Sequence, residues 1–95
     1  MILEIATITL RPGNAEEFIS VMPDAFPFLE STPGYLRHEL HRGLERPEVF
    51  TLLVWWETLE AHTVTFRQSE RFPAWRAVWG QLMESASVEH VTQVY

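Results

Sequence analysis

The sequence predicts an α+β domain with the ferredoxin-like order βαββαβ, in which a four-stranded antiparallel sheet carries helices on one face. Four segments rich in β-branched and apolar residues are typical of strands, at 2–10, 35–42, 49–56 and 88–95. Helical spacing of apolar residues follows the first and third of them. Ninety-five residues suit one domain over 1–95.

The first strand is expected to end at the turn Arg11-Pro12-Gly13. Asn14 then provides a helix N-cap, and Glu17 three residues later resembles a capping box. The apolar side chains that follow at helical spacing are Ala15, Phe18, Met22, Ala25, Phe26 and Leu29.

Two prolines interrupt this helical pattern. Pro23 and Pro27 each remove a backbone donor, which predicts a kink or a restart near Met22. Thr32-Pro33-Gly34 then ends the helical segment.

The second strand alternates, with Leu36 and Leu40 on one face and Arg37, Glu39 and His41 on the other. This pattern is typical of an edge strand. Arg37 and Arg42 could clamp an acidic substrate, although solvated edge charges are the better explanation of both.

The third strand, VFTLLVWW, is apolar on both faces. We expect Leu52, Val54 and Trp56 on one face. Phe50, Trp55 and the positions near Leu53 in the opposite register are expected on the other face. Helices cover only one face of such a sheet, and a large exposed apolar face is unusual in a monomer. The sequence therefore predicts a homodimer that buries the open sheet face.

Two short helices and a strand complete the chain. Thr58 can cap a helix over 59–66, and Ser69 can cap a second one that tolerates Pro73 in its first turn. The apolar stripe expected on this second helix comprises Phe72, Trp75, Trp79, Leu82 and Met83.

Composition excludes several classes of function. Seven basic and thirteen acidic residues give a net charge of −6, which disfavours nucleic acid and anionic membranes as partners. Cysteine and lysine are absent, so thiolate and Schiff-base chemistry are excluded. No apolar run approaches about 18 residues and the first residues do not resemble a signal peptide, so a cytoplasmic location is expected.

The segment from Val54 to Trp75 resembles the antibiotic biosynthesis monooxygenase family, a group of dimeric α+β barrel proteins. The matching motifs are Trp56-Glu57-Thr58, Glu60-Ala61-His62, and Ser69-Glu70-Arg71-Phe72 before Trp75. Arg11-Pro12-Gly13 and Pro33-Gly34-Tyr35 occupy the places where the family carries such turns.

The resemblance implies a homodimer with a pocket between helices and sheet in each subunit. Relatives oxidise aromatic polyketides with molecular oxygen and no metal or flavin, and others degrade haem. Thr65 and Arg71 stand here where many members have histidines, and Thr7 stands where haem-degrading relatives use an asparagine. The haem-degrading pattern is therefore not matched, and no cofactor is implied.

His62 is the candidate catalytic residue. As the one histidine of the family-like motifs it could accept a proton from a phenol or quinol, or it could be a packed histidine that bonds a neighbour. The candidate substrate-binding residues are Trp56, Phe66, Trp75 and Trp79, since aromatic side chains could stack on a flat ligand or simply fill the core.

The remaining histidines do not predict a metal site. His38 and His41 are three residues apart on a strand, which sends them to opposite faces. His90 reaches the pocket only if its face of the last strand is the inner one, and the sequence leaves this open.

Two functions remain in competition at this point. One is a cofactor-free monooxygenase, an oxidoreductase that binds a quinol or anthrone and uses His62 to remove a proton. The other is a non-catalytic ligand-binding or regulatory homodimer on the same scaffold, because a fold does not determine chemistry.

Overall fold

The computed structural model describes all of residues 1–95, and its sheet has the predicted topology. The elements in chain order are β1 (Ile2–Leu10), α1 (Ala15–Glu30), β2 (Tyr35–Arg42), β3 (Val49–Trp56), the π-helical turn η1 (Ala61–Phe66), α2 (Arg71–Trp79), the 3₁₀ turn η2 (Gly80–Leu82) and β4 (Met83–Val91). The strands are antiparallel in the order β2-β3-β1-β4. This confirms the α+β ferredoxin-like fold, with β1 and β3 central and β2 at an edge.

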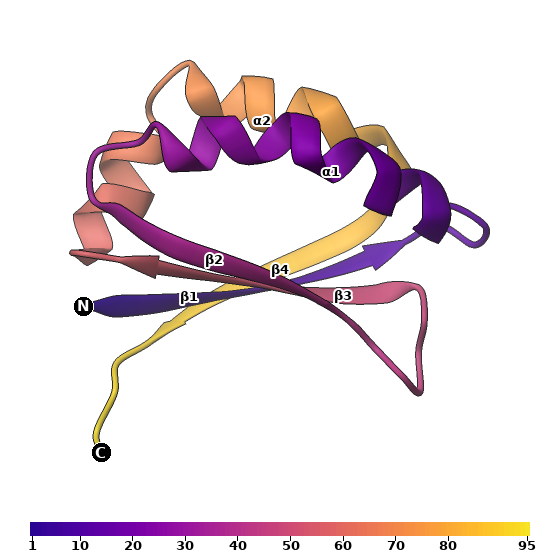
Figure 1. Ribbon diagram of the computed structural model, residues 1–95, viewed down its shortest axis with the longest axis horizontal. Coiled ribbons are helices and arrows are strands. Elements are labelled where there is room, and N and C mark those ends of the chain that lie inside the picture. The colour runs from indigo at the N-terminus through magenta and orange to yellow at the C-terminus, as the bar shows by residue number, and fades with distance from the viewer.

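Both helices lie on one side of the sheet, and no helix covers the other side (Figure 1). Alternate positions of the two central strands face the helices and are buried, because successive side chains of a strand point to opposite faces. These core positions are Glu4, Ala6, Ile8 and Leu10 in β1, and Phe50, Leu52, Val54 and Trp56 in β3. The assignment of Phe50 to the open face was therefore wrong: it shares the even-numbered face with Leu52.

The open face of the central strands is apolar, as expected. Leu3, Ile5, Leu53 and Trp55 are only half-buried in the isolated chain. The Trp55 ring is covered on one side by the Arg37 guanidinium, whose Cζ lies 4.1 Å from the ring centroid. Trp55 and Trp56 thus point to opposite faces, and Trp56 is the one in the core.

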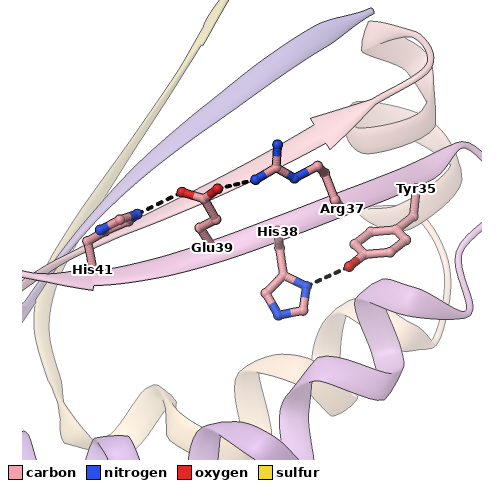
Figure 2. Close-up of polar contacts among 5 residues, drawn as sticks. All are labelled: Tyr35, Arg37, His38, Glu39 and His41. Carbon is pink, nitrogen blue, oxygen red and sulfur yellow. Dashed lines mark hydrogen bonds and ion pairs between the residues drawn. The ribbon is translucent and has the colours of Figure 1, made fainter.

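Figure 2 shows how β2 divides its side chains between the two faces. Arg37, Glu39 and His41 form a row of polar contacts on the open face, with His41 Nε2 2.8 Å from Glu39 Oε1. His38 points to the helices, where Tyr35 Oη lies 2.6 Å from its Nδ1. The prediction that His38 and His41 diverge is confirmed.

The first helix differs in two details from its prediction. It begins after Asn14, but the Asn14 side chain donates to the Leu82 carbonyl at 3.2 Å and makes no capping bond. The predicted capping box was therefore wrong, because the side-chain amide of Asn14 donates to a carbonyl far away in the sequence and does not cap the helix. The helix also continues as one element through Pro23 and Pro27, without a restart near Met22.

The C-terminal half keeps its predicted caps and changes its boundaries. The Ala61 amide donates to Thr58 Oγ1 at 3.1 Å, and the Arg71 amide donates to Ser69 Oγ at 3.2 Å. α2 ends at Trp79, so Leu82 and Met83 lie outside it. β4 runs from Met83 to Val91 instead of 88–95, because it pairs along the whole of β1. None of the helices has the length and apolar character needed to cross a membrane.

Candidate functional site

A cavity of about 330 Å³ lies between the sheet and the helices. Ten of its fourteen lining residues are hydrophobic, so an apolar molecule is the ligand that it favours. Ala86 and Val88 of β4 line it and are exposed, which places its opening at the β4 edge of the sheet.

Aromatic side chains form one wall of this cavity. Phe66, Trp75 and Trp79 line it in edge-to-face contact, with ring centroids 6.2 Å apart for the first pair and 5.7 Å for the second. These contacts fix the rings in the edge-to-face geometry that aromatic pairs prefer. The wall is therefore a rigid surface against which a flat ring can pack.

A carboxyl group lies at the sheet side of the cavity. Glu4 lines the cavity although only 5% of its surface is exposed. The indole N–H of Trp56 donates to Glu4 Oε1 at 3.0 Å. Burial of the carboxyl raises the pKa of Glu4 to about 7, against the opposing effects of the Trp56 hydrogen bond and the Arg67 charge.

His62 contacts this carboxyl from the helical side. It lies in η1 with 3% of its surface exposed, and its Nε2 is 3.4 Å from Glu4 Oε1. Its other nitrogen, Nδ1, is 2.8 Å from Nε2 of His90. Its ring stacks on Trp56 with centroids 5.3 Å apart. Burial, then the Arg67 and His90 charges, lower the pKa of His62 to about 3, so its imidazole is neutral near pH 7.

The π-helical turn places His62 at this point. The Arg67 amide donates to the His62 carbonyl at 3.1 Å, a five-residue step that widens the turn. Both His62 and Phe66 consequently face the sheet and line the cavity.

Hydrogen-bond donors without protein partners also border the cavity. Arg76 and Trp79 line it, and Arg76 Nε and Trp79 Nε1 are buried with no hydrogen-bond partner. Arg67 adds a second positive charge to the lining. Oxygen atoms on an apolar ligand are the groups that the guanidinium groups of Arg67 and Arg76 would bind.

The predicted site residues come together in part. His62, Phe66, Trp75 and Trp79 line the cavity. Trp56 is fully buried and does not line it, but its indole N–H bonds to Glu4, which does. His90 pairs with Glu4 across β1 and β4, which places it on the inner face.

Sequence reasoning missed Glu4. An acidic residue at an even position of β1, in register with Ala6, Ile8 and Leu10, was the available signal, because that face is the core. Arg67 and Arg76 carried no comparable signal, since most arginines on helices are solvated.

The acidic and imidazole groups here do not form a metal centre. The two nitrogens of His62 face different partners, Glu4 on one side and His90 on the other, so the three side chains do not converge on one point. No group of three or more His, Asp or Glu residues is placed to hold a metal ion.

The fold and the site define a small α+β protein with the ferredoxin-like architecture and an apolar cavity between sheet and helices. The sequence profile of the antibiotic biosynthesis monooxygenase (ABM) family matches residues 1–78. The chain belongs to this family.

Two relatives extend the match over almost the whole chain. The protein YczJ of Bacillus subtilis (strain 168) is 34% identical over 95 residues, which cover 99% of this chain and all of YczJ. A Bordetella bronchiseptica protein of known structure, assigned to the same family, is 37% identical with a TM-score of 0.95, over 99% of this chain and 97% of that one.

A third solved structure shares the fold at lower identity. SnoaB of Streptomyces nogalater, described as a cofactor-independent oxygenase, is 19% identical with a TM-score of 0.83, over 99% of this chain and 93% of that chain. This similarity supports the architecture, and the chemistry must be argued from the cavity.

Proposed function

We propose that this chain is a cofactor-independent monooxygenase that oxidises a flat aromatic substrate of the quinol or anthrone type. The observation that carries the proposal is the apolar cavity, which joins a rigid aromatic wall to a buried Glu4 and His62 pair. Membership of the ABM family and the cofactor-independent oxygenase activity of SnoaB agree with it.

The proposed chemistry begins with loss of a proton at the Glu4 and His62 end of the cavity. The resulting carbanion or phenolate is electron-rich and reduces oxygen itself. For an anthrone, oxygen adds at the deprotonated methylene carbon, and loss of water from the hydroperoxide leaves a carbonyl group. The protein contributes orientation and exclusion of water.

The substrate would pack against Phe66, Trp75 and Trp79, and its oxygen atoms would accept from the guanidinium groups of Arg67 and Arg76, which line the cavity. A charged donor in an apolar lining binds an oxygen atom strongly, so an oxygen-bearing ligand gains more here than a hydrocarbon.

Oxygen uptake with anthrone tests this function. We expect uptake above the buffer rate and its loss in His62→Ala, which removes the group that contacts both Glu4 and His90. Uptake equal to buffer would reject the oxygenase. If anthrone nevertheless bound, the non-catalytic ligand-binding or regulatory protein would be the better description.

We further propose that the protein is a homodimer through the open face of the sheet. That face presents Leu3, Ile5, Leu53 and Trp55, which helices do not cover. Pairing two such faces would bury them as the core of an interface.

A further inference from the structure

The carboxyl of Glu4 has one oxygen engaged by the protein and one free. Oε1 accepts from Trp56 and faces His62 Nε2. Oε2 makes no hydrogen bond within the chain, and it is not sealed from solvent as Arg76 Nε and Trp79 Nε1 are. Because Glu4 lines the cavity, Oε2 is the oxygen available to a ligand.

The nitrogens of His62 are both turned toward protein side chains. Nδ1 is hydrogen-bonded to His90 at 2.8 Å, and Nε2 is 3.4 Å from Glu4 Oε1, a contact longer than an ordinary hydrogen bond, while the ring face lies against Trp56. A substrate could reach Nδ1 only by displacing His90, and it would meet Nε2 beside the Glu4 carboxyl. This geometry suits a residue that orients the carboxyl of Glu4.

We propose that Glu4, through Oε2, is the catalytic base, and that His62 and His90 are positioning residues that connect its carboxyl to solvent. This proposal rests on the proposed function and assigns the proton acceptor within that site. The proton of the substrate C–H or O–H passes to Oε2, and the bonding electron pair stays on the substrate. When oxygen has added, the peroxide anion takes this proton back from Oε2, which gives the hydroperoxide and restores the carboxylate.

The charges around Glu4 favour this division of roles. Four side chains face Glu4: Trp56 from β3, His62 from η1, Arg67 at the C-terminal end of η1, and His90 from β4. Arg76 of α2 lines the same cavity. With a pKa of about 7, Glu4 is both substantially ionised and a competent base near neutral pH. With a pKa of about 3, His62 is a weak base at the same pH.

The two imidazoles can pass a proton between solvent and Glu4 while each ring stays neutral overall. When Glu4 is ionised, His62 and His90 each carry their proton on Nε2 and donate toward the carboxylate. A proton added at His90 Nδ1 moves the His90 Nε2 proton to His62 Nδ1 and the His62 Nε2 proton to Oε1 of Glu4, the oxygen that faces His62. Both imidazoles are neutral before and after, so the buried ring never holds a charge.

Nitrogen-15 NMR of the histidine rings tests the connection without any substrate. We expect the proton of His62 to move from Nδ1 to Nε2 as the pH rises through about 7, in step with the carbon-13 shift of the Glu4 carboxyl. His90→Gln should change the midpoint of this switch. A tautomer that does not change with pH, or a His62 ring that becomes imidazolium near pH 6, would overturn the connection.

Oxygen uptake tests the catalytic role. Glu4→Gln keeps the shape of the side chain and an acceptor for Trp56, and we expect it to lower kcat by about 100-fold or more while KM for anthrone changes little. The rise in wild-type kcat through about pH 7 should disappear in this variant. Glu60→Gln, an exposed change outside the cavity, is the matched control.

Two results separate this proposal from the proposed function. Wild-type activity that survives intact in Glu4→Gln would reject Glu4 as the base and leave the oxygenase standing. Absence of oxygen uptake in the wild type would reject the oxygenase and, with it, the catalytic role of Glu4. The NMR result would then show separately whether the Glu4, His62 and His90 connection exists.

Discussion

Glu4 occupies a position where an ionised carboxylate is costly, since the core face of a central strand offers it one hydrogen-bond donor, on Trp56. Evolution of a stable core alone would favour an apolar residue at this place. A buried carboxyl bordering a cavity is instead typical of sites that use a raised pKa. Two residue-scale consequences can be measured.

The first concerns stability as a function of pH. The folded chain holds the Glu4 proton more tightly than the unfolded chain, because the pKa rises from 4.5 to about 7. The stability contributed by this group is therefore complete below about pH 4.5 and is lost as the pH rises through about 7. Relative to wild type, Glu4→Gln should gain up to about 3 kcal/mol between pH 5 and pH 8 in urea unfolding.

Glu60→Gln is the control for this measurement, since Glu60 is exposed. A Glu4→Gln advantage that is the same at both pH values would contradict the raised pKa.

The second concerns the indole hydrogen bond. Trp56→Phe removes the donor that favours the ionised form of Glu4, so the pKa of Glu4 should rise further above about 7. Carbon-13 NMR of the carboxyl measures this change. Trp55→Phe, on the opposite face of the same strand, should leave the titration where it is.

At this scale the sequence predicted His62 and the aromatic wall but not Glu4. Tryptophan and histidine were visible because they stand in a family-like motif. The role of Glu4 depends on its pairing with β3 and β4, which brings Trp56 and His90 beside it from 52 and 86 residues away along the chain. No local pattern contains that information.

Among the elements, η1 depends on the turn that precedes β2. Gly34 has a φ of +91°, and a Cβ added there would lie 2.5 Å from the Cβ of Ala61, the first residue of η1. This close approach lets the π-helical turn lie against the turn between α1 and β2. His62 follows directly, so the glycine helps to place it.

We expect Gly34→Ala to destabilise the fold by about 3 kcal/mol, from both the left-handed backbone and the clash with Ala61. Gly13→Ala is the matched control, because Gly13 has a φ of +88° with nothing within 4 Å of the added Cβ. That variant should lose only about 1 kcal/mol. Equal losses in urea unfolding would show that the contact with Ala61 carries no energy.

The predicted element boundaries match the structure where the apolar pattern of the sequence is strong. They differ from it where strand pairing sets the boundary. β3 was predicted to the residue because it is a nearly unbroken apolar run. β4 was predicted too late in the chain, at 88–95 instead of Met83–Val91, because Met83 to Ser87 carry little apolar signal, although they pair with β1. The π-helical turn was predicted as an ordinary helix, since capping by Thr58 does not specify the width of the turn.

At the scale of the whole molecule, the two faces of the sheet differ. The helix side borders the cavity, and the open side presents the uncovered apolar residues that we propose as a dimer interface. The topology was predictable because six elements in this order have few ways to form an antiparallel sheet. The volume of the cavity was not predictable, since it depends on the rotamers of Phe66, Trp75 and Trp79.

Disruption of the open face should separate the dimer. Leu53→Arg places a charge at the centre of that face, and sedimentation equilibrium at micromolar concentration should then give the mass of one chain. Leu44→Arg, in the loop between β2 and β3 where the side chain is 90% exposed, should leave the mass unchanged. A wild-type protein that sediments as a single chain would reject the interface.

The alternation of β1 has a consequence for how this chain can vary in length. Leu3 and Ile5 face outward on either side of Glu4, so one residue inserted between Ile5 and Ala6 would turn this part of the strand over. The carboxylate would then lie on the open face of the sheet and a leucine would face the cavity. A change of one residue in length is therefore excluded within the strand itself.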